Sequence, residues 1–134
     1  MSDIQPFAMI EVAVMELIEQ LMPDATGDRI GGSLSYDATD DFYVWVGMVP
    51  GSGSADQTSG QWAIDVDVFD STYGQAMTRS LQLEALLLRR GGWRTPSMII
   101  DSAVGGGPSE RPWEDDESAF RVGATYVFTA RRPA

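Results

Sequence analysis

One ten-residue segment of this chain alternates so regularly between apolar and acidic residues that it limits the folds open to the whole sequence. Residues 61–70 read Q-W-A-I-D-V-D-V-F-D. Successive side chains of an extended strand point to opposite faces, so Ile64 and Val66 share one face while Asp65 and Asp67 share the other. The segment therefore predicts a strand with one face in the core and one acidic face in water.

Helix signals follow this strand directly. Ser71 and Thr72 supply hydroxyl groups that accept hydrogen bonds from the first free N–H groups of a helix. The apolar spacing predicts a helix from Tyr73 to about Leu88, and the R-R-G-G sequence at 89–92 ends it with cations and glycine, as helix C-termini prefer. A half-buried strand that leads into an amphipathic helix is typical of a small α+β domain.

The remaining sequence completes one domain over residues 1–134. A first helix is predicted from Ile4 or Gln5 to Met22, where apolar residues recur at helical spacing. Further strands are predicted at Ser33–Tyr36, Phe42–Val49, Ser97–Asp101 and Phe120–Thr129. The expected fold is therefore α+β, with a mixed, mostly antiparallel sheet of four to five strands packed against two helices.

Two segments lack the pattern of a helix or strand. Residues 50–61 join two predicted strands and are rich in Gly and Ser, so we predict a projecting, mobile hairpin loop there. This loop either orders on a partner or is a plain connector, and the residues that would contact the partner are Pro50, Ser52, Ser54, Asp56 and Gln57. Residues 102–119 contain three consecutive glycines, two prolines and an acidic run, and are predicted to be an irregular linker within the domain.

Three side chains are candidates for contacts between subunits. Trp45 lies in a predicted strand whose two faces are both apolar, so the strand is either covered twice or offers one face to another protein. Glu84 interrupts the apolar face of the second helix, and lies either at the helix edge or in an ion pair with an arginine, including one across a subunit contact. Trp113 precedes four carboxylates at 114–117 and is of the residue type enriched at interface hot spots.

The residue types that the chain lacks exclude several kinds of catalytic group and metal ligand. The chain has no Cys and no His, and all its cationic side chains are arginine. Thiol and imidazole nucleophiles, bases and metal ligands are therefore excluded, as is a lysine Schiff base. Asp65 and Asp67, together with Asp70, match a D-x-D cation site, but a solvated strand face is the simpler interpretation. We predict that the protein is not an enzyme and holds no metal and no cofactor.

The formal net charge of −11 limits the partners of the chain. It disfavours tight binding to nucleic acid and to anionic membranes. The apolar stretch at 7–21 contains Glu11, Glu16 and Glu19, so no membrane span is expected there, and the N-terminus lacks the basic segment of a signal peptide. The charge serves either solubility or a surface that lies near nucleic acid without binding it.

The order of the predicted elements and two stretches of sequence carry a resemblance to a known family. Residues 64–70 read I-D-V-D-V-F-D and enter a helix, and residues 120–132 read F-R-V-G-A-T-Y-V-F-T-A-R-R. With the leading helix, the Gly/Ser-tipped hairpin and the S-M-I-I-D strand at 97–101, the chain resembles the tail terminator proteins of long-tailed, non-contractile phages. The resemblance extends over nearly the whole chain and rests on apolar positions and turns, not on an invariant chemical motif.

The resemblance implies a structural virion protein that is assembled in the cytoplasm of a bacterial host and resides in the viral tail. Proteins of this family form a homo-oligomeric ring, expected to be a hexamer, that caps the tail tube. The ring stops polymerisation of the major tail tube protein and joins the tail to the connector or neck protein of the head, while DNA passes through without specific binding. On this view Asp65 and Asp67 would line the lumen, and the 50–61 loop would contact the tube.

Two other functions remain open from the sequence. A head-completion or neck connector protein of the same virions is also a small, ring-forming α+β adaptor. An acidic inhibitor that mimics DNA is compatible with the net charge, although the scattered arginines and the many apolar faces argue against it.

Overall fold

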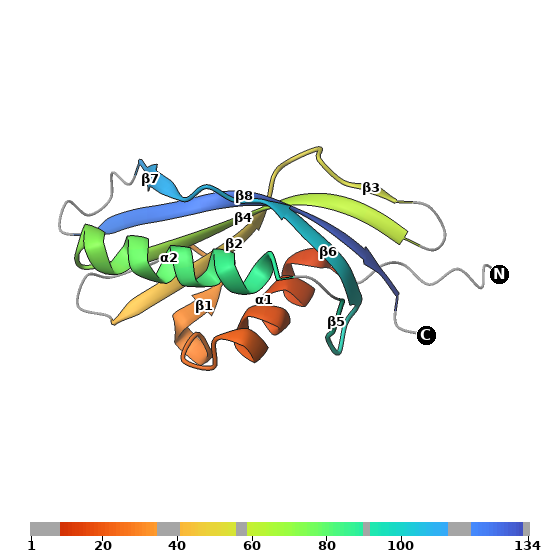
Figure 1. The fold of residues 1–134 in the computed structure, drawn as a ribbon, viewed down its shortest axis with the longest axis horizontal. Coiled ribbons are helices and arrows are strands. Elements are labelled where there is room, and N and C mark those ends of the chain that lie inside the picture. Colours follow the sequence, from red (N-terminus) through yellow and green to blue (C-terminus); the bar gives the residue numbers. More distant parts are fainter. Residues whose placement is uncertain (1–8, 35–40, 56–58, 90–91, 113–118, 133–134) are drawn as a thin grey trace.

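A computed structural model of the chain describes residues 9–34, 41–55, 59–89, 92–112 and 119–132, and the structural statements below concern these ranges. The described elements are two α-helices, one short 3-10 helix and a sheet of eight strands (Figure 1). The fold class is α+β with a mixed, mostly antiparallel sheet, as predicted.

The elements follow one another as helix, hairpin, helix and a second group of strands. The helices are α1 (Ile10–Leu21), η1 (Gly27–Arg29) and α2 (Tyr73–Leu87). The longer strands are β2 (Phe42–Met48), β4 (Ser59–Asp70), β6 (Ile99–Gly105) and β8 (Phe120–Arg131). The shorter strands are β1 (Ile30–Gly31), β3 (Ser54–Ala55), β5 (Trp93–Arg94) and β7 (Ser109–Arg111).

The sheet is centred on the two longest strands, β4 and β8, which pair along their whole length. The strand order is β1-β2-β4-β8-β6-β5, with β3 paired to β4 and β7 paired to β8. Within the described residues, β1 pairs with β2 in parallel and all other pairings are antiparallel. The sheet therefore has two sides, one ending at β1 and β2 and the other ending at β6, β5 and β7.

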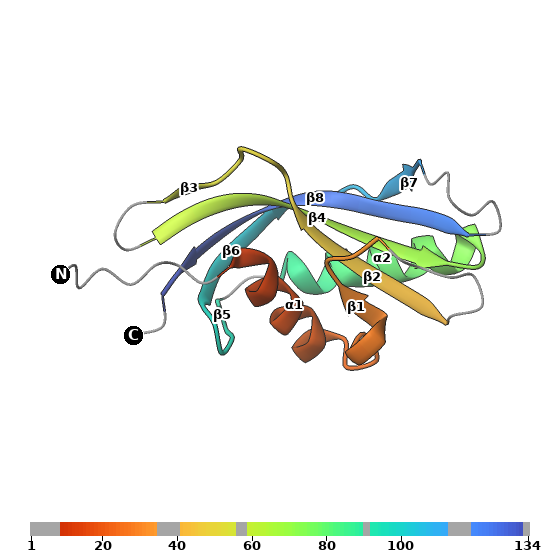
Figure 2. The ribbon, with the colours of Figure 1, turned by 180° about the vertical axis from the view of Figure 1, so that it is seen from behind.

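Both α-helices pack on the same face of the sheet, and the core lies between them and that face. Figures 1 and 2 view the molecule from opposite sides: α2 is nearer to the viewer in Figure 1 and α1 in Figure 2. The helices bury side chains at helical spacing, namely Ile10, Ala13, Val14, Leu17 and Ile18 of α1 and Ala76, Ser80, Leu83 and Leu87 of α2. Each large apolar side chain buried in this way contributes about 1.5–3 kcal/mol.

The junction between β4 and α2 forms as the sequence predicts. Thr72 has extended backbone angles, and its hydroxyl accepts a hydrogen bond from the N–H of Gln75 at 3.2 Å. This is the side-chain N-cap that the sequence signal required. It orients α2 back across the face of the strand that precedes it.

Several predicted boundaries are wrong. The sheet has eight strands instead of four to five. Residues 102–105 belong to β6 and residues 109–111 form β7, so the prediction of an irregular linker fails for both. Because β8 is twelve residues long, one of its edges has room for β6 and β7 end to end, and Gly105, Gly106 and Gly107 supply the positive φ angles of the turn between them.

The N-terminal third also differs from expectation. Met9 is extended and α1 begins at Ile10, later than predicted. The first strand of the sheet is Ile30–Gly31, whereas Ser33 and Leu34 are not in a strand and residues 35 and 36 lie outside the described ranges. None of the described helices combines the length and the hydropathy that a bilayer span requires.

Candidate functional site

The face of the sheet opposite the helices carries Asp65 and Asp67, the two aspartates of the alternating segment. Asp67 is in register with Trp45 on β2 and with Gly123 on β8, and Asp65 is in register with Thr125 on β8. A Cβ atom at position 123 would collide with the carboxylate of Asp67. The glycine therefore leaves the space in which the Asp67 side chain lies against β8.

Two arginines reach these aspartates from neighbouring strands. Nη1 of Arg111 lies 3.0 Å from Oδ1 of Asp65 and 3.1 Å from Oδ1 of Asp67. Nε of Arg121 donates a hydrogen bond to Oδ2 of Asp67 over 2.6 Å. Arg111 also donates to the hydroxyl of Thr125 at 3.1 Å, and that hydroxyl donates to Asp65. We call these five residues the Asp–Arg cluster; it joins β4, β7 and β8.

Asp67 is the most deeply buried member of the Asp–Arg cluster, with no solvent-exposed surface. Its pKa is raised above the ordinary value because burial disfavours the charged form, an effect that outweighs the opposing influence of the Arg111 and Arg121 guanidiniums. Oδ1 of Asp67 accepts no hydrogen bond from a described residue. The ion pair with Arg111 is therefore what offsets the burial of that oxygen atom.

A small apolar group borders the Asp–Arg cluster on the same face. Tyr43, Phe69 and Ala119 are buried together there, with Trp45 packed against them. The guanidinium of Arg121 lies 5.1 Å from the ring centre of Trp45 and 5.5 Å from that of Phe69, within the range of cation–π attraction. Burial also raises the pKa of the Tyr43 hydroxyl. This group covers the second apolar face of β2 within the protomer.

The expectation of an acidic, hydrated strand face is wrong for Asp67. Asp67 is buried, and the two aspartates are matched by the two arginines, so the Asp–Arg cluster is formally neutral. The arginines come from β7 and from β8, which lie more than forty residues further along the chain. Whether Asp65 and Asp67 line a lumen is a property of an assembly and stays a prediction.

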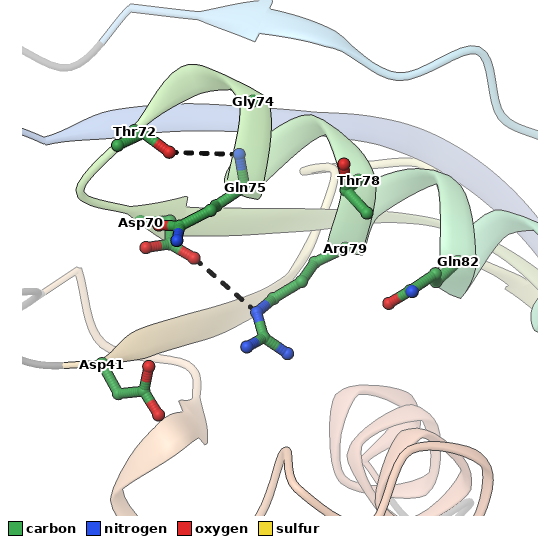
Figure 3. Close-up of a pocket in the computed structure, with 8 residues that line it drawn as sticks. All are labelled: Asp41, Asp70, Thr72, Gly74, Gln75, Thr78, Arg79 and Gln82. Atoms are coloured by element: carbon green, nitrogen blue, oxygen red, sulfur yellow. Dashed lines mark hydrogen bonds and ion pairs between the residues drawn. The ribbon is translucent and has the colours of Figure 1, made fainter.

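A second candidate site lies on the helix side of the sheet, beside the first half of α2 (Figure 3). It is an open depression of about 570 Å³. Its lining consists of Asp41, Asp70, Thr72, Gly74, Gln75, Thr78, Arg79 and Gln82. Six of these eight residues belong to α2 or to its N-cap. The depression is therefore lined mainly by one helix, which presents hydroxyl and amide groups to it.

Arg79 supplies the positive charge of this depression. Its Nε lies 3.6 Å from Oδ2 of Asp70, and its guanidinium carbon lies 3.7 Å from the ring centre of Phe42. Figure 3 shows the guanidinium reaching from α2 across the open space toward Asp41. Asp41 itself forms an ion pair with Arg29 at 2.9 Å. The depression therefore presents hydrogen-bonding groups and a stacked guanidinium to whatever docks against α2.

The predicted partner-contact loop is partly a strand. Ser54 and Ala55 form β3, which pairs with the first residues of β4. The hydroxyl of Ser52 donates to the carbonyl of Ala63 at 3.3 Å and accepts from its N–H at 3.2 Å. Pro50 and Ser54 are exposed, whereas Asp56 and Gln57 lie outside the described residues. The two arms of the predicted hairpin loop over 50–61 therefore pair with one another near its tip, and the expectation that the loop projects and contacts a partner stays a prediction.

The three predicted subunit contacts have different outcomes. The indole N–H of Trp45 donates to the carbonyl of Gly32 at 3.0 Å, and the ring is half-buried. Glu84 is half-buried, and its Oε1 accepts a hydrogen bond from the N–H of Gly107 at 2.9 Å, which ties α2 to the turn before β7. Trp113 lies outside the described residues. No observation tests whether Trp45 or Glu84 contacts a second subunit.

Sequence reasoning missed Arg111, Arg121 and Arg79. Arg111 and Arg121 pair with an aspartate more than forty residues away, whereas Arg79 pairs with Asp70 nine residues away. The alternation in the last strand places Arg121 on one face with Gly123 and Thr125 but does not identify its partner. Within the described residues, no three acidic side chains converge on a position able to hold a metal ion. The sequence matches no protein-family model, and no curated protein matches it significantly.

Proposed function

We propose that this protein is a tail terminator of a long-tailed, non-contractile phage. In this proposal it is a structural component of the virion that works as a ring of identical copies, expected to be a hexamer. The ring caps the tail tube, stops its polymerisation and provides the surface that joins the tail to the neck protein of the head.

The arrangement of the two sheet edges carries this proposal. On one side, β1 covers only Val44 and Trp45 of β2 and leaves the outer edge of Val46–Met48 without a described partner strand. On the other side, β5 pairs only with Ile99 and Ile100 of β6, and the stretch up to Gly105 has no partner strand on that edge within the described parts of the chain. Each open stretch bears an exposed apolar side chain, Met48 or Val104.

Two unlike open edges on one chain favour head-to-tail association. Unpaired edges with exposed apolar residues are normally protected in soluble proteins, and contact with another copy is one such protection. Because the two edges differ, a neighbouring copy covers each of them with a different surface of its own, and such heterologous contacts produce rings when they close. The order of the described elements, with a helix first, a hairpin next and a strand that runs into a helix, also agrees with the resemblance in the sequence.

Electron microscopy of phage particles that lack this protein tests the proposal. A terminator limits tube growth, so we expect overlong tail tubes without heads, and addition of purified protein to the assembly mixture should restore normal length. Tails of normal length that fail to attach to heads would instead indicate a neck connector protein.

The acidic-inhibitor alternative predicts a different result in the same system. Particles made without an inhibitor would assemble normally, and the protein would copurify with a nucleic-acid enzyme instead of with tails. The pairing of Asp65 and Asp67 with arginines disfavours this alternative, because a DNA mimic must present its carboxylates to the partner.

A further inference from the structure

We infer that the outward face of α2 in one copy docks against the β1–β2 edge of the next copy. This inference rests on the proposed function, since it specifies how identical copies touch in the ring. The outward face of α2 is defined here by Tyr73, Gly74, Gln75, Thr78, Leu81, Gln82 and Ala85, which are all exposed. The β1–β2 edge is defined by the exposed side chains Leu34 and Met48 and the backbone around them.

The outward face of α2 carries no charge. None of its seven exposed residues is charged, although the chain carries 20 acidic and 9 cationic side chains. Leu81 is 48% exposed and Tyr73 is 43% exposed, so two large apolar side chains about two turns apart on this helix face water. Two copies with a net charge of −11 each repel one another, and they approach at least cost where neither presents a carboxylate.

The β1–β2 edge is uncharged as well. No charged residue occurs from Phe42 to Ala55 or from Ile30 to Leu34. Met48 is 39% exposed and Leu34 is 46% exposed, and the outer backbone of β2 beyond Trp45 has no described partner strand. This edge therefore offers apolar side chains together with strand backbone that has no partner strand among the described residues.

The outward face of α2 and the β1–β2 edge are two different surfaces of the chain. α2 packs across β4 and β8 and contacts β7, and its Arg79 reaches Phe42 at the start of β2, whereas β1 and β2 form one edge of the sheet. Two different surfaces are what a head-to-tail contact needs. The depression beside α2 adds Thr78, Gln82 and the stacked guanidinium of Arg79 as hydrogen-bond donors for the carbonyl groups of an open edge strand.

The exposed apolar residues of α1 do not fit this role. Val12 is 40% exposed, but Glu11 precedes it in the first turn and Glu19 is exposed further along the same helix. The outward side of α1 is thus acidic, and a second acidic copy meets it only at an electrostatic cost. Val12 is therefore a matched control: an apolar residue on a helix, with an exposure close to that of Leu81.

Cysteine cross-linking tests the contact directly, because the chain has no cysteine of its own. The double variant Leu81→Cys with Met48→Cys, assembled on purified tail tubes and mildly oxidised, should give a ladder of covalent multimers up to the ring size. Each single variant and the control pair Val12→Cys with Met48→Cys should give at least about tenfold less multimer, since head-to-tail contact brings only the first pair together. Circular dichroism spectra equal to that of the wild type establish that the variants fold.

The outcomes separate this inference from the proposed function. Rings visible on the tubes without a ladder, or an equal ladder from the Val12 control pair, would overturn the α2 contact and leave the terminator proposal standing. A ladder in free solution from a protein that has no affinity for tail tubes would support the contact and contradict the terminator proposal. Leu81→Asp gives a second measurement, because it should abolish ring formation whereas Val12→Asp should not.

Discussion

The environment of Asp67 in the structure differs from the one that its position in the sequence predicts. In the sequence it is one of two carboxylates on an alternating strand, and in the folded protein it is completely buried between Arg111 and Arg121. A buried ion pair gains little net free energy, because the cost of removing charges from water offsets most of their attraction. The Asp–Arg cluster therefore holds β7 and β8 in place more than it stabilises the protein as a whole.

Removal of the two partners of this ion pair should have unequal effects. Asp67→Asn removes the buried charge, leaves Arg111 with Asp65 and keeps an amide oxygen that accepts a hydrogen bond from Arg121, so we expect the free energy of unfolding to change by about 1 kcal/mol or less at pH 7. Arg121→Gln leaves the buried carboxylate without its closest cation and should cost about 3–5 kcal/mol. Urea denaturation of both variants measures this, and an equal loss in the two would contradict our account of the cluster.

The pH dependence of the same pair has a defined sign. The pKa of Asp67 is raised by burial, against the influence of Arg111 and Arg121 and with a contribution from Asp65, so the folded protein binds this proton more tightly than the unfolded chain. The stability that protonation contributes is complete below the ordinary pKa and is lost as pH rises through the raised pKa. Wild type should therefore gain stability relative to Asp67→Asn as the pH falls from about 7 to about 4.

At the level of elements, local signals predicted α2 and the start of β6, whereas the second half of β6 and the whole of β7 were not predicted. Thr72 caps α2 through a side chain that lies three residues from its partner, so the signal is local. The second half of β6 and the strand β7 form because they pair with the backbone along the edge of β8, and backbone pairing leaves little trace in side-chain composition. The glycine-rich sequence at 105–107 forms only the turn between these two strands. The irregular structure does not continue beyond this turn into β6 or β7.

The cap of α2 has a measurable contribution. Thr72→Ala removes the hydroxyl that accepts from Gln75 N–H and should lower the free energy of unfolding by about 0.5–2 kcal/mol. Thr72→Ser keeps a capping oxygen and should stay within about 0.5 kcal/mol of wild type. Thermal and urea denaturation compare the two, and a loss in Thr72→Ser as large as that in Thr72→Ala would show that the methyl group, not the cap, is what matters.

At the level of the whole molecule, the fold encloses one main core on the helix side and a smaller apolar group on the opposite face. Each contains a tyrosine whose hydroxyl is shielded from water, Tyr126 in the main core and Tyr43 in the smaller group. Burial raises the pKa of both, and the nearby Glu84 carboxylate raises that of Tyr126 further. Both cores therefore depend on these phenols remaining neutral.

Alkaline pH should weaken the fold through these two tyrosines. The unfolded phenols ionise near their ordinary pKa of 10.0 while the folded ones stay protonated, so the stability that they contribute is complete below that pH and is lost as the pH rises above it. Tyr126→Phe removes one of them, and its urea midpoint should fall less than that of wild type between about pH 9 and about pH 11. An equal fall in both proteins would mean that other groups govern alkaline unfolding.

The sequence by itself determined the elements whose signals are local. The period-two pattern of β4, the hydroxyl cap and apolar spacing of α2 and the apolar pattern of β8 each lie within about twenty residues, and the structure confirms these elements and the α+β class. The two-sided apolar pattern of β2 left open whether the strand is covered on both faces or offers one face to another protein, and the packing of Tyr43 with Phe69 covers the side away from the helices within the protomer.

Only the tertiary structure decided which charges meet and which surfaces stay open. Asp67 is neutralised by arginines more than forty residues away, because the pairing of β4, β8 and β7 places them side by side. The open edges of β2 and β6 and the uncharged outward face of α2 exist only once neighbouring elements have covered the rest. Local sequence specifies a strand or a helix, whereas the partners of a side chain depend on contacts between segments that are far apart in the chain.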